Sequence, residues 1–386
     1  MRIGVPRETF PGERRVAMTP RAMDLLAKSN VEVLIEPGAG EPSGVSDSEF
    51  QQKGARIARD RRQVFEESDL ILQVRTLGAN PDAGRADLPL LRSGQALIGF
   101  GEPLTAAAEY REIAAHGVTS FAMELMPRIT RAQSMDALSS MATIAGYKAV
   151  LMAADTLPRM FPMLMTAAGT VSPARVFVLG AGVAGLQAIA TARRLGAVVH
   201  AYDVRAAVKE QIESLGAKFV VVNVDAGQAE DKGGYAKELG AEFYRRQREV
   251  LTEVLREQDV VITTAAVPGK KAPLLITRDM VAAMPPESIV VDLAAERGGN
   301  CELTQPGQTV VEGNVMIMGP LNLPSTVPFH ASQMYSRNVA AFVKHLLRDG
   351  ALSTGDSDEI TRETLVTHGG EIVNSRVRDL AAVPTT

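Results

Sequence analysis

The sequence predicts an α/β protein with two doubly wound, Rossmann-like domains joined by long helices. Short apolar runs alternate with helical patterns through nearly the whole chain, which is typical of a parallel sheet with crossover helices. The runs form two groups of five or six, one in each half of the chain. Two longer helical patterns, over 135–155 and 331–347, follow the first and the second group.

Composition sets the broad class. The chain has 386 residues, of which 46% are hydrophobic and 22% charged, as in globular proteins with two or three domains. Its formal net charge of −4 gives no electrostatic reason to expect a nucleic-acid partner. The single cysteine, Cys301, excludes an internal disulfide, and we find no metal-ligand spacing. Without a leader pattern or a run of about 20 apolar residues, we expect neither secretion nor direct membrane insertion.

The first half of the chain contains five predicted strands. Between the first two, Thr19 and Pro20 are typical of the N-cap and first residue of a helix, which should end near Ser29 and Asn30. The predicted strands are Arg2–Val5, Val31–Glu36, Leu70–Val74, Ala96–Phe100 and Val118–Ala122.

The second half contains six predicted strands and the long helical patterns. Met135–Asp155 and Ala331–Leu347 each carry apolar residues at helical spacing. Leu352–Val373 is typical of a strand pair that turns at His368-Gly369-Gly370. The predicted strands are Arg175–Leu179, Val198–Tyr202, Phe219–Val222, Val260–Thr264, Ile289–Leu293 and Val315–Met318.

In the simplest topology, the chain crosses between the domains on the first long helix and returns on the second. We therefore expect 1–136 with 348–386 to form an N-terminal α/β domain. The second domain would span 137–330, and 331–347 would be the returning bridge helix.

A glycine-rich turn in the second domain has the full context of a dinucleotide-binding motif. Gly180-Ala181-Gly182-Val183-Ala184-Gly185 follows a strand and opens a helix. In such a motif Gly180 makes the tight turn, Gly182 lets the backbone approach the pyrophosphate, and Gly185 packs the helix close to the strand. The helix N-terminus then offers N–H groups to the phosphates. The alternative is a tight turn with no ligand.

The residues after the next strand select the cofactor. Asp203 ends that strand, where a carboxylate accepts hydrogen bonds from the adenosine ribose and repels a 2′-phosphate. Arg205 could instead hold a 2′-phosphate. Because an uncompensated carboxylate beside a phosphate is costly, we expect NAD(H) rather than NADP(H).

Long motifs extend across essentially the whole chain. They are Pro6-Arg7-Glu8, Gly12-Glu13-Arg14-Arg15-Val16-Ala17, the run 126–136, Thr166-Ala167-Ala168-Gly169-Thr170-Val171, Asp203-Val204-Arg205, Gly233-Gly234-Tyr235-Ala236-Lys237, the run 263–270 and Asp292-Leu293-Ala294. On these motifs the chain resembles the NAD(H)-binding domain I of proton-translocating nicotinamide nucleotide transhydrogenase, in the superfamily of alanine dehydrogenase.

The resemblance implies roles for residues in both domains. Arg128, Gln133 and Asp136, with Ser139 nearby, match the loop that surrounds the nicotinamide; from the residues alone they could be an ordinary exposed loop. The stretch 225–247 resembles a loop that closes over the nucleotide, although its residues alone indicate only a solvated loop and helix. Its matching residues are Gly234, Tyr235 and Gln247, and Val183, Val204, Arg205 and Ala266 also fall at family cofactor contacts.

An alanine dehydrogenase needs further groups. Arg15 matches the arginine that binds the substrate carboxylate. The family's lysine should lie within 72–75 and its histidine within 98–102, and this sequence has neither there. Hydride transfer between two nicotinamides needs no general base, only two rings held face to face without water.

The resemblance therefore implies an NAD(H)-binding transhydrogenase subunit, with no acid or base among its catalytic residues. NADP(H) and the membrane span would be on partner subunits. These would hold this chain, as a homodimer by the pattern of the family, at the inner face of the cytoplasmic membrane. A free-standing NAD-dependent amino-acid dehydrogenase is the alternative, and a non-catalytic NAD(H)-binding regulator is a third possibility.

Overall fold

The computed structural model describes residues 1–222, 241–267, 269–348, 350–355 and 357–381. The chain forms two compact units, one of Met1–Met141 with Pro324–Thr386 and the other of Ala142–Leu323. The limits differ from the predicted ones. In particular, residues 331–347, predicted as a bridge between domains, are part of the first unit.

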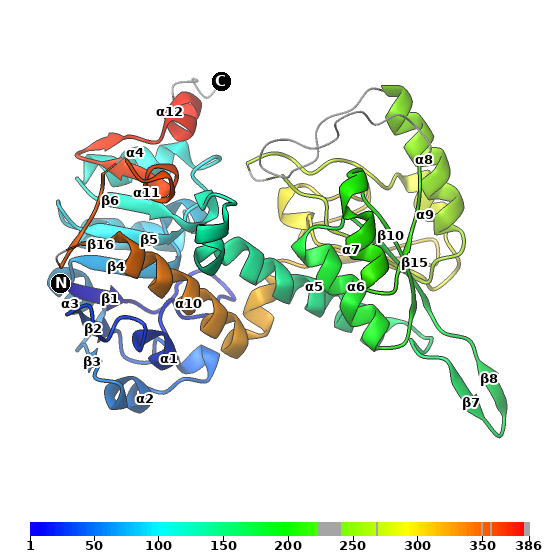
Figure 1. The fold of residues 1–386 in the computed structure, drawn as a ribbon, viewed down its shortest axis with the longest axis horizontal. Coiled ribbons are helices and arrows are strands. Elements are labelled where there is room, and N and C mark those ends of the chain that lie inside the picture. The colour runs from blue at the N-terminus through cyan, green and yellow to red at the C-terminus, as the bar shows by residue number, and fades with distance from the viewer. Residues whose placement is uncertain (223–240, 268, 349, 356, 382–386) are drawn as a thin grey trace. The chain divides into compact units, whose positions relative to one another are not determined.

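The first unit is built on an eight-stranded sheet. Six strands are parallel in the order β3-β2-β1-β4-β5-β6, which is the doubly wound order. The strand pair β18-β19, close to the C-terminal end, continues the sheet antiparallel to β6 (Figure 1). The strands are β1 (Arg2–Val5), β2 (Glu32–Ile35), β3 (Arg56–Ile57), β4 (Leu70–Arg75), β5 (Ala96–Phe100), β6 (Thr119–Ala122), β18 (Leu365–His368) and β19 (Glu371–Ile372).

Helices cover this sheet. They are α1 (Pro20–Met23), α2 (Asp47–Gln52), α3 (Arg61–Glu67), α4 (Ala107–Ala115), α10 (Pro328–Leu346), α11 (Glu359–Thr364) and α12 (Ser375–Ala381). Helix α1 begins at Pro20 as predicted but ends at Met23, because the amides of Leu25, Leu26 and Ser29 close three-residue turns in place of helical ones. The predicted strand pair is shorter than 352–373, since Asp358 caps helix α11 before it.

The second unit has a seven-stranded sheet in the order β11-β10-β9-β12-β13-β15-β14, parallel except for the last strand. Its strands are β9 (Arg175–Leu179), β10 (Val198–Tyr202), β11 (Lys218–Phe219), β12 (Val260–Thr263), β13 (Ile289–Asp292), β14 (Thr309–Glu312) and β15 (Val315–Met318). Both sheets are thus doubly wound, which confirms the predicted fold class. A separate antiparallel hairpin, β7 (Leu164–Thr166) with β8 (Gly169–Val171), was not predicted.

The helices of this unit include α6 (Val183–Arg194), α7 (Lys209–Ser214), α8 (Ala241–Leu255) and α9 (Arg278–Ala282). The long helix α5 (Ala137–Thr156) contains the boundary between the units. By length and composition alone α5 could cross a membrane, but core helices of water-soluble proteins have the same properties. Its residues Ala149, Val150 and Ala153 are buried in the core of the second unit, which accounts for its apolar character.

Candidate dinucleotide-binding site

The glycine-rich turn lies between β9 and α6, and its three glycines differ in their surroundings. Gly180 has φ +99°, and its N–H donates to the Tyr202 carbonyl at 2.8 Å. A Cβ on Gly185 would lie 1.8 Å from the Gly180 carbonyl oxygen, so only glycine lets the helix approach the turn this closely. A Cβ on Gly182 would meet nothing within 4 Å. This space beside bare backbone fits a pyrophosphate.

The first turn of α6 also fits an anion. Gly182 is the N-cap residue, and none of the described side chains caps the helix there. The first turn has no acidic residue, and the basic Arg193 and Arg194 are in the last turn. The unpaired N–H groups and positive end of the helix dipole at this terminus therefore suit phosphate oxygens. Val183, at the first helical position, is 39% exposed.

Asp203 connects the end of β10 to the glycine turn. Its Oδ2 accepts a hydrogen bond from the Ala181 N–H at 2.7 Å, and its Oδ1 accepts one from the Arg205 N–H at 2.9 Å. The Arg205 guanidinium forms an ion pair with the same carboxylate at 2.8 Å. Burial opposes ionisation, but these hydrogen bonds and the charge of Arg205 outweigh it and hold the pKa of Asp203 below its usual range. Asp203 therefore presents a negative charge and also shapes the turn.

A buried network below the turn was missed at the sequence level. Asp292, at the end of β13, accepts hydrogen bonds from Thr263, Ala294, Asn300, Cys301 and Thr304. The Asn300 side chain accepts from the Ala265 N–H at 3.0 Å and donates to the Ala265 carbonyl at 2.8 Å. This fixes the backbone next to Ala266, which is exposed. The motif Asp292-Leu293-Ala294 could have indicated Asp292; no local signal marks Asn300.

The remaining predicted contacts of the second unit differ in placement. Gln247, on α8, is buried and donates to the Tyr202 hydroxyl at 3.0 Å, and burial raises the pKa of that hydroxyl to about 12. Val204 is half-buried beside Asp203. Gly234 and Tyr235 lie outside the described residues.

The predicted nicotinamide residues are part of the first unit. Asp136 accepts hydrogen bonds from the Ser139 N–H at 2.9 Å and from its hydroxyl at 2.6 Å, and so caps the start of α5. Arg128 and Gln133 are exposed, Gln133 within the short 3-10 helix η5 (Thr130–Met135). The structure thus places Asp136 and Ser139 in contact, and two longer polar side chains on the surface of the same segment.

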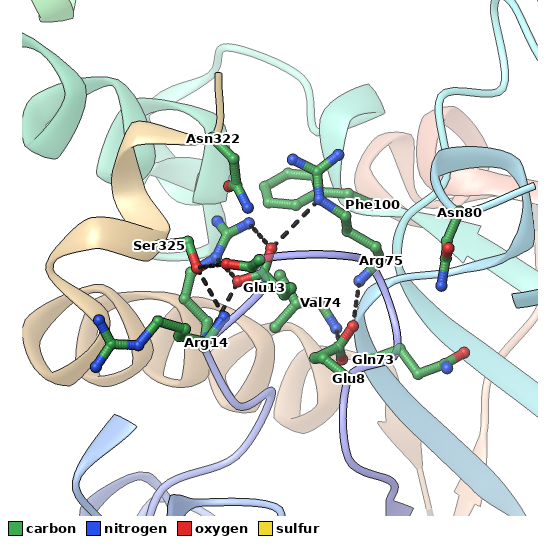
Figure 2. Close-up of polar contacts among 12 residues, drawn as sticks. Glu8, Glu13, Arg14, Gln73, Val74, Arg75, Asn80, Phe100, Asn322 and Ser325 are labelled. Atoms are coloured by element: carbon green, nitrogen blue, oxygen red, sulfur yellow. Dashed lines mark hydrogen bonds and ion pairs between the residues drawn. The ribbon is translucent and has the colours of Figure 1, made fainter. Parts of the chain in front are cut away.

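The arginine expected for a substrate carboxylate already has a carboxylate of its own. Two hydrogen bonds, of 2.7 and 2.6 Å, join the Arg15 guanidinium to Glu13, and both side chains are buried. Burial opposes the ionisation of Glu13, but Arg15 and Arg75 lower its pKa to about 2. Figure 2 shows Arg75, from the stretch where the lysine was sought, facing Glu13. A substrate carboxylate at Arg15 would have to displace Glu13.

A second carboxyl group lies near this pair. Glu8 accepts hydrogen bonds from the Val74 N–H at 2.6 Å and the Arg75 N–H at 3.2 Å (Figure 2). Burial, together with the nearby charge of Glu13, raises the pKa of Glu8 to about 8. Its neighbours are backbone amides and an ion pair that is already satisfied, which gives it no imine or water chemistry to perform. Among the described residues, no group of three or more His, Cys, Asp or Glu could hold a metal ion.

Comparisons with known proteins agree with this arrangement. Residues 4–145 match the alanine dehydrogenase/PNT N-terminal domain, and residues 149–375 match the C-terminal domain. The first of the two alpha-subunit polypeptides of NAD(P) transhydrogenase from Rhodospirillum rubrum is 46% identical over 97% of this chain and 98% of its own. The crystal structure of transhydrogenase from Sinorhizobium meliloti has a TM-score of 0.85 at 43% identity, covering 97% of this chain and 100% of that one.

Alanine dehydrogenase from Mycobacterium tuberculosis is 30% identical over 100% of this chain and 98% of its own. The difference in identity, 46% against 30%, parallels the occupation of Arg15 by Glu13. The resemblance found in the motifs is therefore confirmed: the chain belongs to the alanine dehydrogenase/PNT family, and within it is more similar to the transhydrogenase subunit than to alanine dehydrogenase.

Proposed function

We propose that this chain is the NAD(H)-binding subunit of a proton-translocating transhydrogenase, in which hydride passes between NADH and NADP⁺ held on a partner component. The observation that carries the proposal is the glycine turn: open at Gly182, closed at Gly185, and fixed by Asp203 through the Ala181 amide. The Glu13–Arg15 pair supports it by occupying the arginine that an amino-acid dehydrogenase would need.

Bound NADH supplies the hydride, and the protein's contribution is to bind, orient and exclude water. The N–H groups at the start of α6 would hold the pyrophosphate, and Asp203 would accept hydrogen bonds from the adenosine ribose. A 2′-phosphate there would face a buried carboxylate whose pKa is held low, so NADP(H) is disfavoured.

For the nicotinamide we propose Arg128, Gln133, Asp136 and Ser139. An arginine and an amide can hold the carboxamide, while the Asp136–Ser139 hydrogen bonds keep that carboxylate at the start of α5. None of these side chains has to act as an acid or a base. Val183, Val204, Arg205, Gly234, Tyr235, Gln247 and Ala266 are the further cofactor contacts that we propose.

The proposed assembly follows from this function. The membrane-spanning part and the NADP(H)-binding site would be on separate transhydrogenase subunits. They would hold this chain, as a homodimer, at the inner face of the cytoplasmic membrane. Docking would require no membrane insertion of α5, because that helix contributes to a protein core.

The test combines binding and turnover on one sample. The purified chain is titrated with NADH and with NADPH by fluorescence and assayed for alanine oxidation. It is then reconstituted with the membrane-spanning and NADP(H)-binding subunits of a transhydrogenase. We expect selective NADH binding, no amino-acid turnover, and hydride transfer only in the reconstituted complex. NADH production from alanine by the chain alone would instead establish the dehydrogenase function, and NADH binding without transfer would favour a regulatory module.

Gln133→Asn tests the nicotinamide role. Shortening the side chain by one methylene displaces its amide by about 1 Å, and misplacement on that scale lowers reaction rates by up to about 100-fold. We expect stopped-flow hydride transfer to slow by at least tenfold. The dissociation constant for NADH should change by less than about threefold, because the pyrophosphate contacts are elsewhere. A loss of affinity with an unchanged rate would contradict this role.

A further inference from the structure

The proposed nicotinamide segment, residues 128–136, is attached within its own unit by a side-chain cluster centred on Asp358. The Arg131 guanidinium lies 2.5 Å from Asp358 Oδ1. Asp358 Oδ2 lies 2.8 Å from His345 Nε2 and accepts hydrogen bonds from the Thr361 N–H at 2.9 Å and hydroxyl at 3.0 Å. One carboxylate therefore joins η5, the last turn of α10 and the start of α11.

A second attachment lies three residues further along the segment. The Asn338 side chain, from the middle of α10, donates to the Ser134 carbonyl at 2.9 Å and is buried. Ala132 and Met135 are buried, whereas Gln133 is exposed. The exposed amide is thus held between two attachments, at Arg131 and at Ser134, and both involve α10.

We propose that Asp358 is a positioning residue for hydride transfer: through Arg131 it fixes the segment that carries Arg128, Gln133 and Asp136. This inference rests on the function proposed above. Asp358 itself contacts no cofactor in this scheme and acts through the backbone of η5.

Two properties of the cluster support a positioning role over one in overall stability. The side chains of Arg131 and Asp358 are 52% and 29% exposed, and ion pairs at such exposure add little to the free energy of unfolding. Burial acts against ionisation of Asp358, but the hydrogen bonds from Thr361, Arg131 and His345 hold its pKa well below its usual range. The attachment therefore persists at all ordinary pH values.

The test compares Arg131→Gln, Asp358→Asn and the double variant with a matched control. The control is Arg85→Gln, which breaks a pair with Glu112 in the same unit at the same 2.5 Å and similar exposure, 50% and 36%. Three quantities are measured: the single-turnover rate of hydride transfer in the reconstituted complex, the dissociation constant for NADH, and amide hydrogen exchange over 129–136.

We expect each single variant to slow hydride transfer about three- to tenfold, with NADH affinity changed less than about twofold. The double variant should be no slower than the slower single variant, because both substitutions break one attachment. Amide exchange over 129–136 should be faster in both and unchanged in Arg85→Gln. Arg131→Gln leaves the Asp358 cap of α11 intact, so it remains decisive if Asp358→Asn folds poorly.

Rates that multiply in the double variant, or amide exchange that is the same as in the unmodified chain, would overturn the inference. So would an equal loss of rate in Arg85→Gln. The exchange measurement needs no turnover, so it tests the attachment independently. Absence of hydride transfer in the unmodified complex would instead contradict the proposed function.

Discussion

Two glycines of the same turn should fail in opposite ways when each is replaced by alanine. In Gly185→Ala the new Cβ would lie 1.8 Å from the Gly180 carbonyl oxygen. Because this neighbour is backbone, relief requires the helix and the turn to move apart by more than about 1 Å. Overpacking of this kind costs about 1–3 kcal/mol. For a unit of this size, that lowers the melting temperature by about 2–12 °C.

In Gly182→Ala the methyl group would meet nothing within 4 Å, and the backbone at φ −73° accepts alanine. We expect a melting temperature within about 2 °C of the unmodified chain. The methyl group would, however, occupy the space assigned to the pyrophosphate. Loss of one or two charge-assisted hydrogen bonds, about 1.5–3 kcal/mol each, weakens NADH binding at least tenfold.

The assay is thermal unfolding without ligand, followed by a fluorescence titration with NADH for each variant. Gly185→Ala should lose stability, and Gly182→Ala should lose affinity alone. An unchanged melting temperature for Gly185→Ala would refute the close-packing argument. NADH binding by Gly182→Ala at the affinity of the unmodified chain would show that the phosphates do not lie beside this residue.

Three further substitutions test the charged groups. Asp203→Asn should weaken NADH binding about tenfold and improve the relative binding of NADPH, because Arg205 loses its partner; unchanged affinities for both in parallel titrations would rule out the cofactor assignment. Glu13→Gln should lower the free energy of unfolding by about 3–5 kcal/mol in denaturant titrations, since Arg15 is left buried without a counter-charge; a loss under 1 kcal/mol would contradict this. Because the pKa of Glu8 is raised from 4.5 to about 8, its contribution is complete below pH 4.5 and is lost as pH rises through about 8. From pH 6 to 9 the unmodified chain should therefore lose about 1–3 kcal/mol more than Glu8→Gln; equal losses would refute the shift.

The strands could be predicted closely because their physics is local. The runs at β5, β9 and β10 are apolar on both faces and end at turn residues, so their limits agree with the structure. Helix α11 was missed, because a six-residue helix held by one capping aspartate produces little periodicity. The hairpin β7-β8 was also missed, since its strands have only three residues each and pair with no larger sheet.

The site divides in the same way. The glycine turn and Asp203 follow from spacing, because the turn, the helix and the strand end are contiguous in sequence. The partners that fix them are not contiguous: Asn300 reaches Ala265, and Asp358 reaches Arg131, across long stretches of chain. The Glu13–Arg15 pair is close in sequence, yet a carboxylate two residues from an arginine does not reveal that both are buried together.

The double duty of Asp203 limits how the cofactor preference of this chain could evolve or be redesigned. One carboxylate orders the glycine turn through the Ala181 amide and also discriminates between the two cofactors. A single substitution that admits the phosphorylated cofactor therefore also loosens the turn that must bind it. A productive switch of preference needs at least two changes, one to remove the charge and one to supply a new acceptor for the Ala181 amide. Intermediates along such a path would bind both cofactors poorly, which makes this preference hard to reverse one step at a time.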